Sequence, residues 1–320
     1  MVKIRVEKQI GDSVLSFETG ELAKQATSSV LVQYGETVVL IAATTGPSRP
    51  GTDFFPLTCD YRERFAAAGK FPGGFIKRES RPTTKETLTS RLIDRPIRPL
   101  FPEGFFDEVQ VQAMVMSSDV QNDADVIAMN GAAAALFVSS LPFQGPIASC
   151  RVGKVDGKLI AFPTHSQLEE SELDMIVSAN EKEVMMIEGF AQEMSEAEML
   201  EAIKFAHDVC KEVIELQRDF YAKVQPTKAE FTAQDTSELL GRLTNDYYNR
   251  FKDAKQIEGK QARNEACNVL REEAVAAYIP DPAAEGAIQK DLFYRVWHTM
   301  ENKVVRDLIL SGRRSDGRDT

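Results

Sequence analysis

The sequence contains few of the residues that build metal centres or covalent cross-links. Its 320 residues include four cysteines, three histidines and one tryptophan. The cysteines lie far apart, without the paired spacing of a zinc site, and the histidines are equally scattered along the chain. We therefore expect buried free thiols, as in a reducing compartment, and we assign no metal site to these residues.

Long apolar runs are also missing. No segment approaches the ~20 apolar residues that a membrane-spanning helix needs, and residues 1–7 alternate apolar and charged side chains, unlike a signal peptide. With 43% hydrophobic and 27% charged residues, the composition is typical of a soluble globular protein. We expect a cytoplasmic protein with no membrane partner.

The chain is too long for one ordinary core, and its character changes near residue 228. Before that point, apolar alternation predicts strands at 2–10, 14–17, 29–32, 37–42, 54–61, 108–116, 147–155, 158–162, 173–179 and 183–189. Capping boxes at Thr83 and Ser195 predict helices that run to Pro96 and to about Val224, and Asp123 or Asp125 should cap an alanine-rich buried helix. Clustered strands with a few covering helices indicate an α+β core with mixed sheets.

The second part of the chain reads as a separate all-α domain at 229–311. There is almost no strand pattern between residues 235 and 310. Apolar residues recur at every fourth position near the end, at Leu292, Val296, Met300, Val304 and Leu308, which predicts one buried helical stripe. Turn residues resume at 312–320.

A concentrated basic segment stands out in a chain whose net charge is −11. Residues 73–102 hold seven lysines and arginines against three acids: Lys77, Arg78, Arg81, Lys85, Arg91, Arg95 and Arg98 against Glu79, Glu86 and Asp94. Phe75 lies beside these charges on a glycine-rich loop, a combination that can stack a base and neutralise a phosphate chain. Taken alone, Arg91, Arg95 and Arg98 could equally form an ion-paired helix end with Asp94.

Two stretches of this segment carry a family resemblance. The runs GGFIKRESRP at 73–82 and TSRLIDRPIRPLFP at 89–102 resemble the first core of bacterial polynucleotide phosphorylases, and the similarity extends over nearly the whole chain. The resemblance implies a first RNase PH-like core at 1–228, the helical domain at 229–311 and the truncated start of a second core at 312–320. It also implies that this chain is the amino-terminal part of a longer enzyme.

The resemblance further implies an activity for that longer enzyme. Its family degrades single-stranded RNA from the 3′ end in messenger RNA turnover, with inorganic phosphate as co-substrate and nucleoside diphosphates as products. We expect Mg²⁺ in the second core, a homotrimeric ring and, as partners, proteins of an RNA degradosome.

Two departures from the family pattern predict that this core has no catalytic residue and no metal site. The segment at 122–127 reads NDADVI where the catalytic core has a serine-rich phosphate site. Asp174 matches one metal-binding aspartate, but Leu168 stands where its partner would be, and a single carboxylate holds a divalent ion weakly.

The RNA-binding residues are retained. Phe75, Lys77 and Arg78 match the family's loop at the RNA entrance, although Ile76 and Lys77 replace a phenylalanine and an arginine. Arg81, Arg91, Arg95 and Arg98 match arginines on the path to the active site. We therefore expect an RNA-binding, non-catalytic core. The alternatives are a non-catalytic RNase PH-like ring subunit and a structural module whose basic patch contacts a protein.

Overall fold

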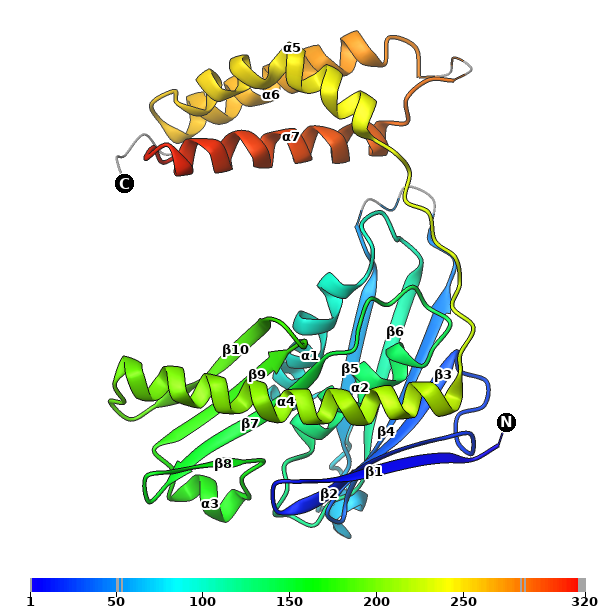
Figure 1. Cartoon of the computed structure of the whole chain (residues 1–320). Coiled ribbons are helices and arrows are strands. Elements are labelled where there is room, and N and C mark those ends of the chain that lie inside the picture. Colours follow the sequence, from blue (N-terminus) through cyan, green and yellow to red (C-terminus); the bar gives the residue numbers. More distant parts are fainter. Residues whose placement is uncertain (1, 50–51, 53, 283, 285, 316–320) are drawn as a thin grey trace. The chain divides into compact units, whose positions relative to one another are not determined.

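The computed structural model describes residues 2–49, 52, 54–282, 284 and 286–315. It divides into two compact units, one formed by residues 1–48 and 55–232 and the other by residues 49–54 and 233–320. The first unit holds two sheets and the second holds three helices (Figure 1). Residues 316–320, in the predicted start of a second core, lie outside the described residues.

The larger sheet of the first unit has six strands in the order β1-β2-β3-β4-β6-β5. The strands are β1 (Ile4–Ile10), β2 (Ser13–Thr19), β3 (Ser28–Tyr34), β4 (Thr37–Gly46), β5 (Leu57–Glu63) and β6 (Glu108–Ser117). Neighbours are antiparallel except β5 and β6, which run parallel. The long connection from β5 to β6 contains first the glycine-rich basic loop and then α1 (Thr84–Ile97).

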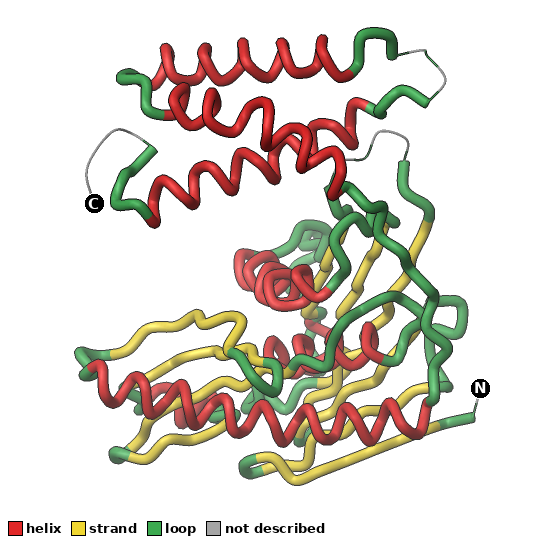
Figure 2. Tube along the Cα trace, turned by 45° about the horizontal axis from the view of Figure 1, so that its top comes forward, coloured by secondary structure: helices red, strands yellow, loops and turns green. Residues whose placement is uncertain are grey.

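The smaller sheet has four antiparallel strands in the order β10-β9-β7-β8. They are β7 (Ala148–Val155), β8 (Lys158–Ala161), β9 (Leu173–Ala179) and β10 (Val184–Ala191). A short helix, α3 (His165–Glu169), precedes β9, and the long α4 (Glu196–Val224) follows β10 and crosses strands of both sheets (Figure 2).

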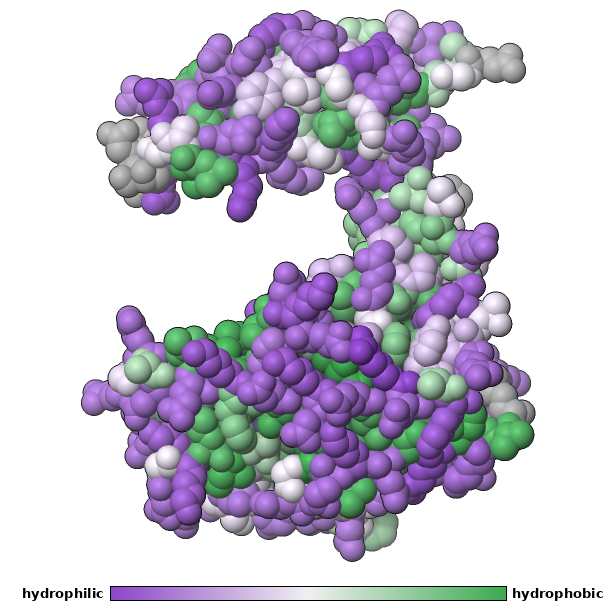
Figure 3. Space-filling view, in the orientation of Figure 1, coloured by the Kyte–Doolittle hydropathy of each residue, from purple (hydrophilic) through white to green (hydrophobic). Residues whose placement is uncertain are grey.

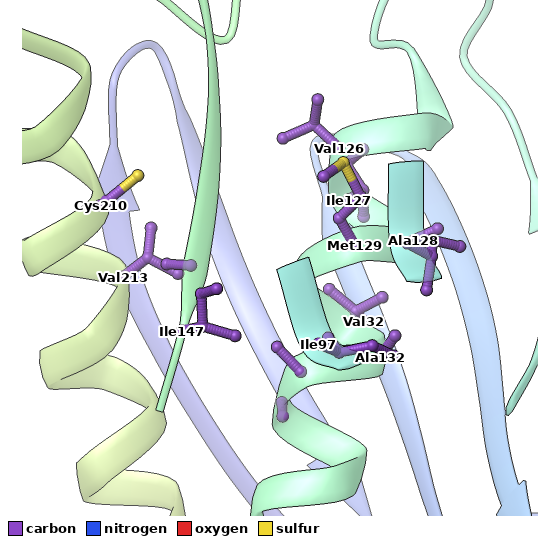
Figure 4. Packing of buried hydrophobic residues seen from close by; sticks show 14 of the residues in the cluster. Val32, Ile97, Val126, Ile127, Ala128, Met129, Ala132, Ile147, Cys210 and Val213 are labelled. Atoms are coloured by element: carbon purple, nitrogen blue, oxygen red, sulfur yellow. The ribbon is translucent and has the colours of Figure 1, made fainter. Parts of the chain in front are cut away.

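Helix α2 (Ala124–Phe137) lies in the middle of this unit, and nearly all of its residues are buried. It contacts β3 and β4 of one sheet and β7 of the other. Gly131 permits the close approach, since a Cβ there would lie 2.6 Å from Val32 Cγ1 and 2.8 Å from Ile41 Cγ1. Figure 4 shows Val32, Met129 and Ala132 within this packing. The alanine-rich sequence of α2 thus lets one helix fill a narrow space between two sheets.

The sequence misplaced three details of this unit. Helix α1 does not end at Pro96 but includes it, because the proline removes only one N–H in the last turn and the Arg98 N–H still bonds to Asp94. Strand β5 begins at Leu57 rather than at residue 54. Helix α3, which has its own capping box at Thr164, was not predicted because it is only five residues long.

The second unit consists of α5 (Ser237–Lys255), α6 (Lys260–Tyr278) and α7 (Lys290–Leu310). The predicted stripe of α7 lies in its core, where Val296, Met300, Val304 and Leu308 are buried. Trp297 packs there against neighbouring aromatic rings. An α+β core followed by a helical module is therefore confirmed.

Hydrophilic residues cover much of the molecular face drawn in Figure 3. Within the described part of the chain, no helix is both long enough and apolar enough to cross a membrane.

Candidate functional site

The basic loop between β5 and α1 is anchored at its base and exposed at its tip. At the base, the Phe65 N–H donates to Glu79 Oε1 at 2.8 Å, and Arg64 Nη1 donates to the Glu79 carbonyl at 2.5 Å. These two bonds close the loop between residues 64–65 and residue 79. The first part of the segment packs on β6, where the Ser118 N–H donates to the Ala67 carbonyl, whereas residues 73–78 are exposed.

The tip carries an aromatic ring with cations beside it. The Phe75 side chain is 93% exposed, and the Arg78 guanidinium lies 5.9 Å from its ring centre while donating to the Phe75 carbonyl. Gly73 has φ +108°, and the Lys77 side chain lies over it, so that a Cβ there would be 3.0 Å from Lys77 Cδ. An exposed ring with adjacent positive charge can stack a nucleobase and attract its phosphate.

The first turn of α1 is held by the predicted capping box, in which Thr83 Oγ1 accepts from the Glu86 N–H and Glu86 accepts from the Thr83 N–H. Glu86 also accepts from the Glu63 N–H of β5 at 2.9 Å, which fixes the helix to the sheet. Arg91 and Arg95 are both exposed on the helix fixed in this way.

The cations of this segment differ in their partners. Arg95 pairs with Glu188 on β10. Arg81 and Arg91 are exposed and form no ion pair with any residue that the structure describes. Lys85 pairs with both Glu63 and Asp123, at 2.9 Å each. Lys85 is therefore committed to the protein, while Arg81 and Arg91 face solvent.

Arg98 has an internal role in this structure. Its guanidinium binds both oxygens of Asp94, at 2.8 and 2.5 Å, and donates to the carbonyls of Phe55 and Leu57 at 2.9 and 3.0 Å. Four of its five donors are thus used to hold the end of α1 on the start of β5. For Arg98 the geometry matches the ion-paired helix end, whereas Arg91 has no such partner.

A cluster of three aspartates surrounds one arginine at the start of α2. Arg151 of β7 binds Asp174 through two bonds of 2.8 Å, and its Nη1 also reaches Asp123 at 3.2 Å and Asp125 at 3.1 Å. The arginine side chain is only 16% exposed. Burial alone would lower the pKa of Arg151, but its bonds to Asp174 and the other carboxylates raise it instead. The guanidinium of Arg151 therefore keeps its positive charge.

The two aspartates of α2 also occupy the helix N-terminus. Asp123 is the N-cap and accepts from the Asp125 N–H, while Asp125 Oδ1 accepts from the Val126 N–H at 2.6 Å. Burial, followed by the Asp123 charge, raises the pKa of Asp125 to about 6. Burial also opposes ionisation of Asp123, but Lys85 and Arg151 outweigh it and lower the Asp123 pKa. Carboxylates thus fill the positions where a helix start would bind an anion.

Neither a phosphate ion nor a divalent cation fits this cluster. A phosphate would face the Asp123 and Asp125 carboxylates, and Asp174 already has both oxygens bound by Arg151. Across the described residues, no three or more His, Cys, Asp or Glu side chains are placed to hold a metal ion.

No role was predicted for Arg151 from the sequence. One sequence feature could have indicated its role. Arg151 is a charged residue within strand β7, and its neighbours Cys150 and Val152 are both fully buried. A charge in such a place needs a buried partner.

Three sequence models of known protein families match this chain. A sequence model described as 3′ exoribonuclease family, domain 1, matches residues 14–142, and one for domain 2 of the same family matches residues 145–209. A third, described as polyribonucleotide nucleotidyltransferase, RNA binding domain, matches residues 238–319.

Curated relatives carry the same name. A polyribonucleotide nucleotidyltransferase from Rhodopirellula baltica is 65% identical over 317 residues, which cover 99% of this chain and 42% of the relative. One from Hyphomonas neptunium is 45% identical over 306 residues, covering 95% of this chain and 43% of the relative. The chain thus spans less than half the length of these relatives.

Among solved structures, rice Rrp46 superposes with a TM-score of 0.53 at 15% identity, covering 66% of this chain and 95% of the rice protein. This likeness shows an RNase PH-like fold. The two domain models of one family together match more than half of the sequence. The chain belongs to the 3′ exoribonuclease family, with polyribonucleotide nucleotidyltransferases as its relatives.

Proposed function

We propose that this chain is the RNA-binding, non-catalytic first core, with its helical domain, of a phosphorolytic 3′-to-5′ exoribonuclease. The names of its relatives and the match to an RNA-binding domain support the RNA-degrading function. The exposed Phe75, with Lys77 and Arg78 beside it, supports RNA binding by the loop tip.

The observation that carries the non-catalytic role is the neutralised cluster around Arg151. Phosphorolysis needs a bound phosphate as nucleophile and positive charge to stabilise the transferring phosphoryl group. In this core, the arginine that could supply that charge is bound to Asp174, Asp123 and Asp125. The cluster therefore has no free cation for a phosphate and no free carboxylate for a metal ion.

The remaining properties belong to the whole protein. In this proposal inorganic phosphate is its co-substrate, Mg²⁺ is held outside this chain, and the assembly is a cytoplasmic homotrimer that degrades messenger RNA with degradosome proteins. No step of that reaction is assigned to residues of this chain.

The test is an assay of the 320-residue chain with poly(A), inorganic phosphate and Mg²⁺. The Rhodopirellula baltica relative serves as the positive control. We expect no nucleoside diphosphate above a control without protein, although the chain retards a labelled single-stranded oligonucleotide. Release of nucleoside diphosphate by this chain would contradict the non-catalytic role, and failure to bind the oligonucleotide would contradict the RNA-binding role.

A further inference from the structure

The helical unit has a polar cleft between two of its helices. Helix α6 contacts α5 more extensively than it contacts α7, so the unit is only partly closed on the side where α6 and α7 meet. A cavity of about 170 Å³ lies on this side. Its lining comes from all three helices and consists of Phe251, Lys255, Asn264, Cys267, Asn268, Arg271, Trp297 and Glu301.

The face of α6 that lines the cleft is polar where a packing face would be apolar. Its lining residues follow the i, i+3, i+4, i+7 spacing of a helical stripe that faces other helices: Asn264, Cys267, Asn268 and Arg271. A helix that only packs fills such a stripe with apolar residues, as α7 does. On α6 only Ala274 is fully buried. Packing therefore does not explain why this stripe is polar.

The other two helices supply aromatic rings and an ion pair. Phe251 of α5 and Trp297 of α7 are 1% and 3% exposed, so they form the deepest part of the lining. Lys255 Nζ lies 2.7 Å from Glu301 Oε1 and 5.1 Å from the centre of the Phe251 ring. A flat ring that enters the cleft would thus meet apolar atoms at its base.

The charge around the cleft is positive. The Cys267 thiol lies near three cations and one carboxylate. Burial raises the pKa of this thiol and Glu301 acts in the same direction, whereas the nearby cations act to lower it: Lys255, Arg263 and Arg271. Glu301 is paired with Lys255, while Arg263 and Arg271 form no ion pair with a described residue. The cleft therefore attracts an anion.

Two side-chain amides provide hydrogen-bonding groups of both kinds. Asn268 Oδ1 accepts from Arg271 Nη2 at 3.0 Å, which leaves the amide N–H groups of Asn268 free to donate. Asn264 has no side-chain hydrogen bond to a described residue, so it can both donate and accept. Asparagine amides pair with the edges of nucleobases, which carry donors and acceptors side by side.

The size of the cavity limits which base fits. A cavity of about 150 Å³ holds one benzene ring, so this one admits a single six-membered ring but not the two fused rings of a purine. Asn264, Asn268 and Arg271 are exposed, so they form the mouth of the cleft. A base could enter there while its sugar and phosphate stay outside.

We propose that this cleft binds one pyrimidine nucleotide of a single-stranded RNA. The base lies against Phe251 and Trp297, its edge is bound by the two asparagines, and its phosphate is bound by Arg271. A phosphate ion alone would use the arginine but neither the amides nor the rings. The inference rests on the proposed RNA-binding function and adds to it a site in the unit that matches the RNA-binding domain model.

The first experiment uses the single tryptophan of the chain, which lines the cleft. We expect U₁₂ RNA to quench the Trp297 fluorescence, and A₁₂ RNA to quench it much less. Asn264→Ala with Asn268→Ala should raise the U₁₂ concentration at half-quenching about 5- to 150-fold, the range for loss of the hydrogen bonds to one base edge.

The matched control is Asn249→Ala. Asn249 is exposed on α5 and does not line the cleft, so this variant should respond to U₁₂ as wild type does. Alanine favours a helix, and the asparagines replaced in the double variant are exposed, so thermal melts of both variants should match wild type.

Alkylation of Cys267 by iodoacetamide gives a second measurement, read by mass spectrometry of the peptides. U₁₂ should slow this reaction several-fold, because the base covers the thiol in the cleft. Cys59, which belongs to the first unit, is the internal control and should react at the same rate with and without RNA.

The outcomes separate the two proposals. If labelled U₁₂ and A₁₂ both fail to bind wild type by anisotropy, the proposed RNA-binding function is wrong and the cleft falls with it. If they bind but neither Trp297 fluorescence nor Cys267 alkylation changes, only the cleft is wrong. Equal quenching by A₁₂ and U₁₂ would overturn the pyrimidine assignment. Uridine monophosphate that quenches as well as U₁₂ at the same nucleotide concentration would show a site for free nucleotides instead of an RNA strand.

Discussion

Replacing Arg151 by methionine removes the only cation within hydrogen-bonding distance of Asp174 and Asp125 among the described residues. Methionine keeps most of the aliphatic volume, so the change is mainly electrostatic. Asp125 and Asp123 have side chains only 7% and 11% exposed, and they cannot move into water without unwinding the start of α2. The variant thus leaves up to three neighbouring carboxylates without their shared counter-ion.

The expected cost follows from burial. Breaking a buried ion pair by removing one partner costs about 3–5 kcal/mol, because the remaining charge stays desolvated. For a unit of this size, each kcal/mol lowers the melting temperature by about 2–4 °C, so we expect a loss of about 6–20 °C at pH 7. The loss should shrink toward pH 4.5, because the pKa of Asp125 is already about 6 and removal of Arg151 raises it further.

Differential scanning calorimetry at pH 7 and pH 4.5 measures this effect. Arg218→Met is the matched control, because Arg218 pairs with Glu181 at 2.5 Å on the surface with a side chain 53% exposed, and such pairs contribute about 0–1 kcal/mol. Fluorescence of the single tryptophan, Trp297, follows the helical unit and should be unchanged. The reasoning is wrong if both variants lose the same amount of melting temperature, or if Arg151→Met loses the same amount at both pH values.

Two further predictions concern binding and pH. Lys77→Ala with Arg78→Ala should weaken binding of a labelled single-stranded A₁₂ RNA and reduce the slope of log K, the association constant, against log salt by about 1.4, since each neutralised phosphate on a single strand contributes about 0.7. Anisotropy titrations at four salt concentrations measure this slope. An unchanged slope would show that the loop does not contact phosphate. Asp125→Asn should flatten the pH dependence of stability between about pH 4 and 7. Burial raises the pKa of Asp125 to about 6 in the folded protein. Its protonated carboxyl therefore adds about 3 kcal/mol to the free energy of unfolding below its ordinary pKa, and this stabilisation is lost as the pH rises through 6. Urea unfolding at several pH values in this range measures the free energy of unfolding of both proteins. If the value for wild type rises with pH as steeply as that for the variant, the prediction is wrong.

Local sequence signals were enough to predict most of the fold. Thr83 and Ser195 begin their helices as capping boxes, because such signals act within one helical turn. The alternating residues of β6 and the continuous apolar run of α2 are also local patterns that a single core explains. Pro96 was misleading because a proline in the last turn removes only one hydrogen bond.

The candidate site could be predicted only in part. The basic loop is visible in one short segment of the sequence, and Phe75 of that segment is exposed in the structure. The Arg151 cluster joins residues up to 51 positions apart in sequence, at Asp123, Arg151 and Asp174. Contacts of this kind come from the tertiary arrangement and leave no local pattern.

The ion pairs also determine how strongly this segment can attract RNA. A count of lysines and arginines at 73–102 gives seven cations, and seven phosphate contacts on a single strand would give a salt slope of about −5. Lys85 is held by two carboxylates, and Arg98 uses four of its donors within the protein. The partners of Lys85 and Arg98 are part of the fold. For RNA to bind either cation, α1 would have to separate from β5 or α2 would have to lose its N-cap contact. Arg95 is also paired, with Glu188, but both side chains are about half exposed, so a phosphate can replace that partner. Five cations are then available, which corresponds to a slope of about −3.5. A measured slope near −5 would mean that RNA displaces these internal ion pairs, and that the segment is remodelled when it binds.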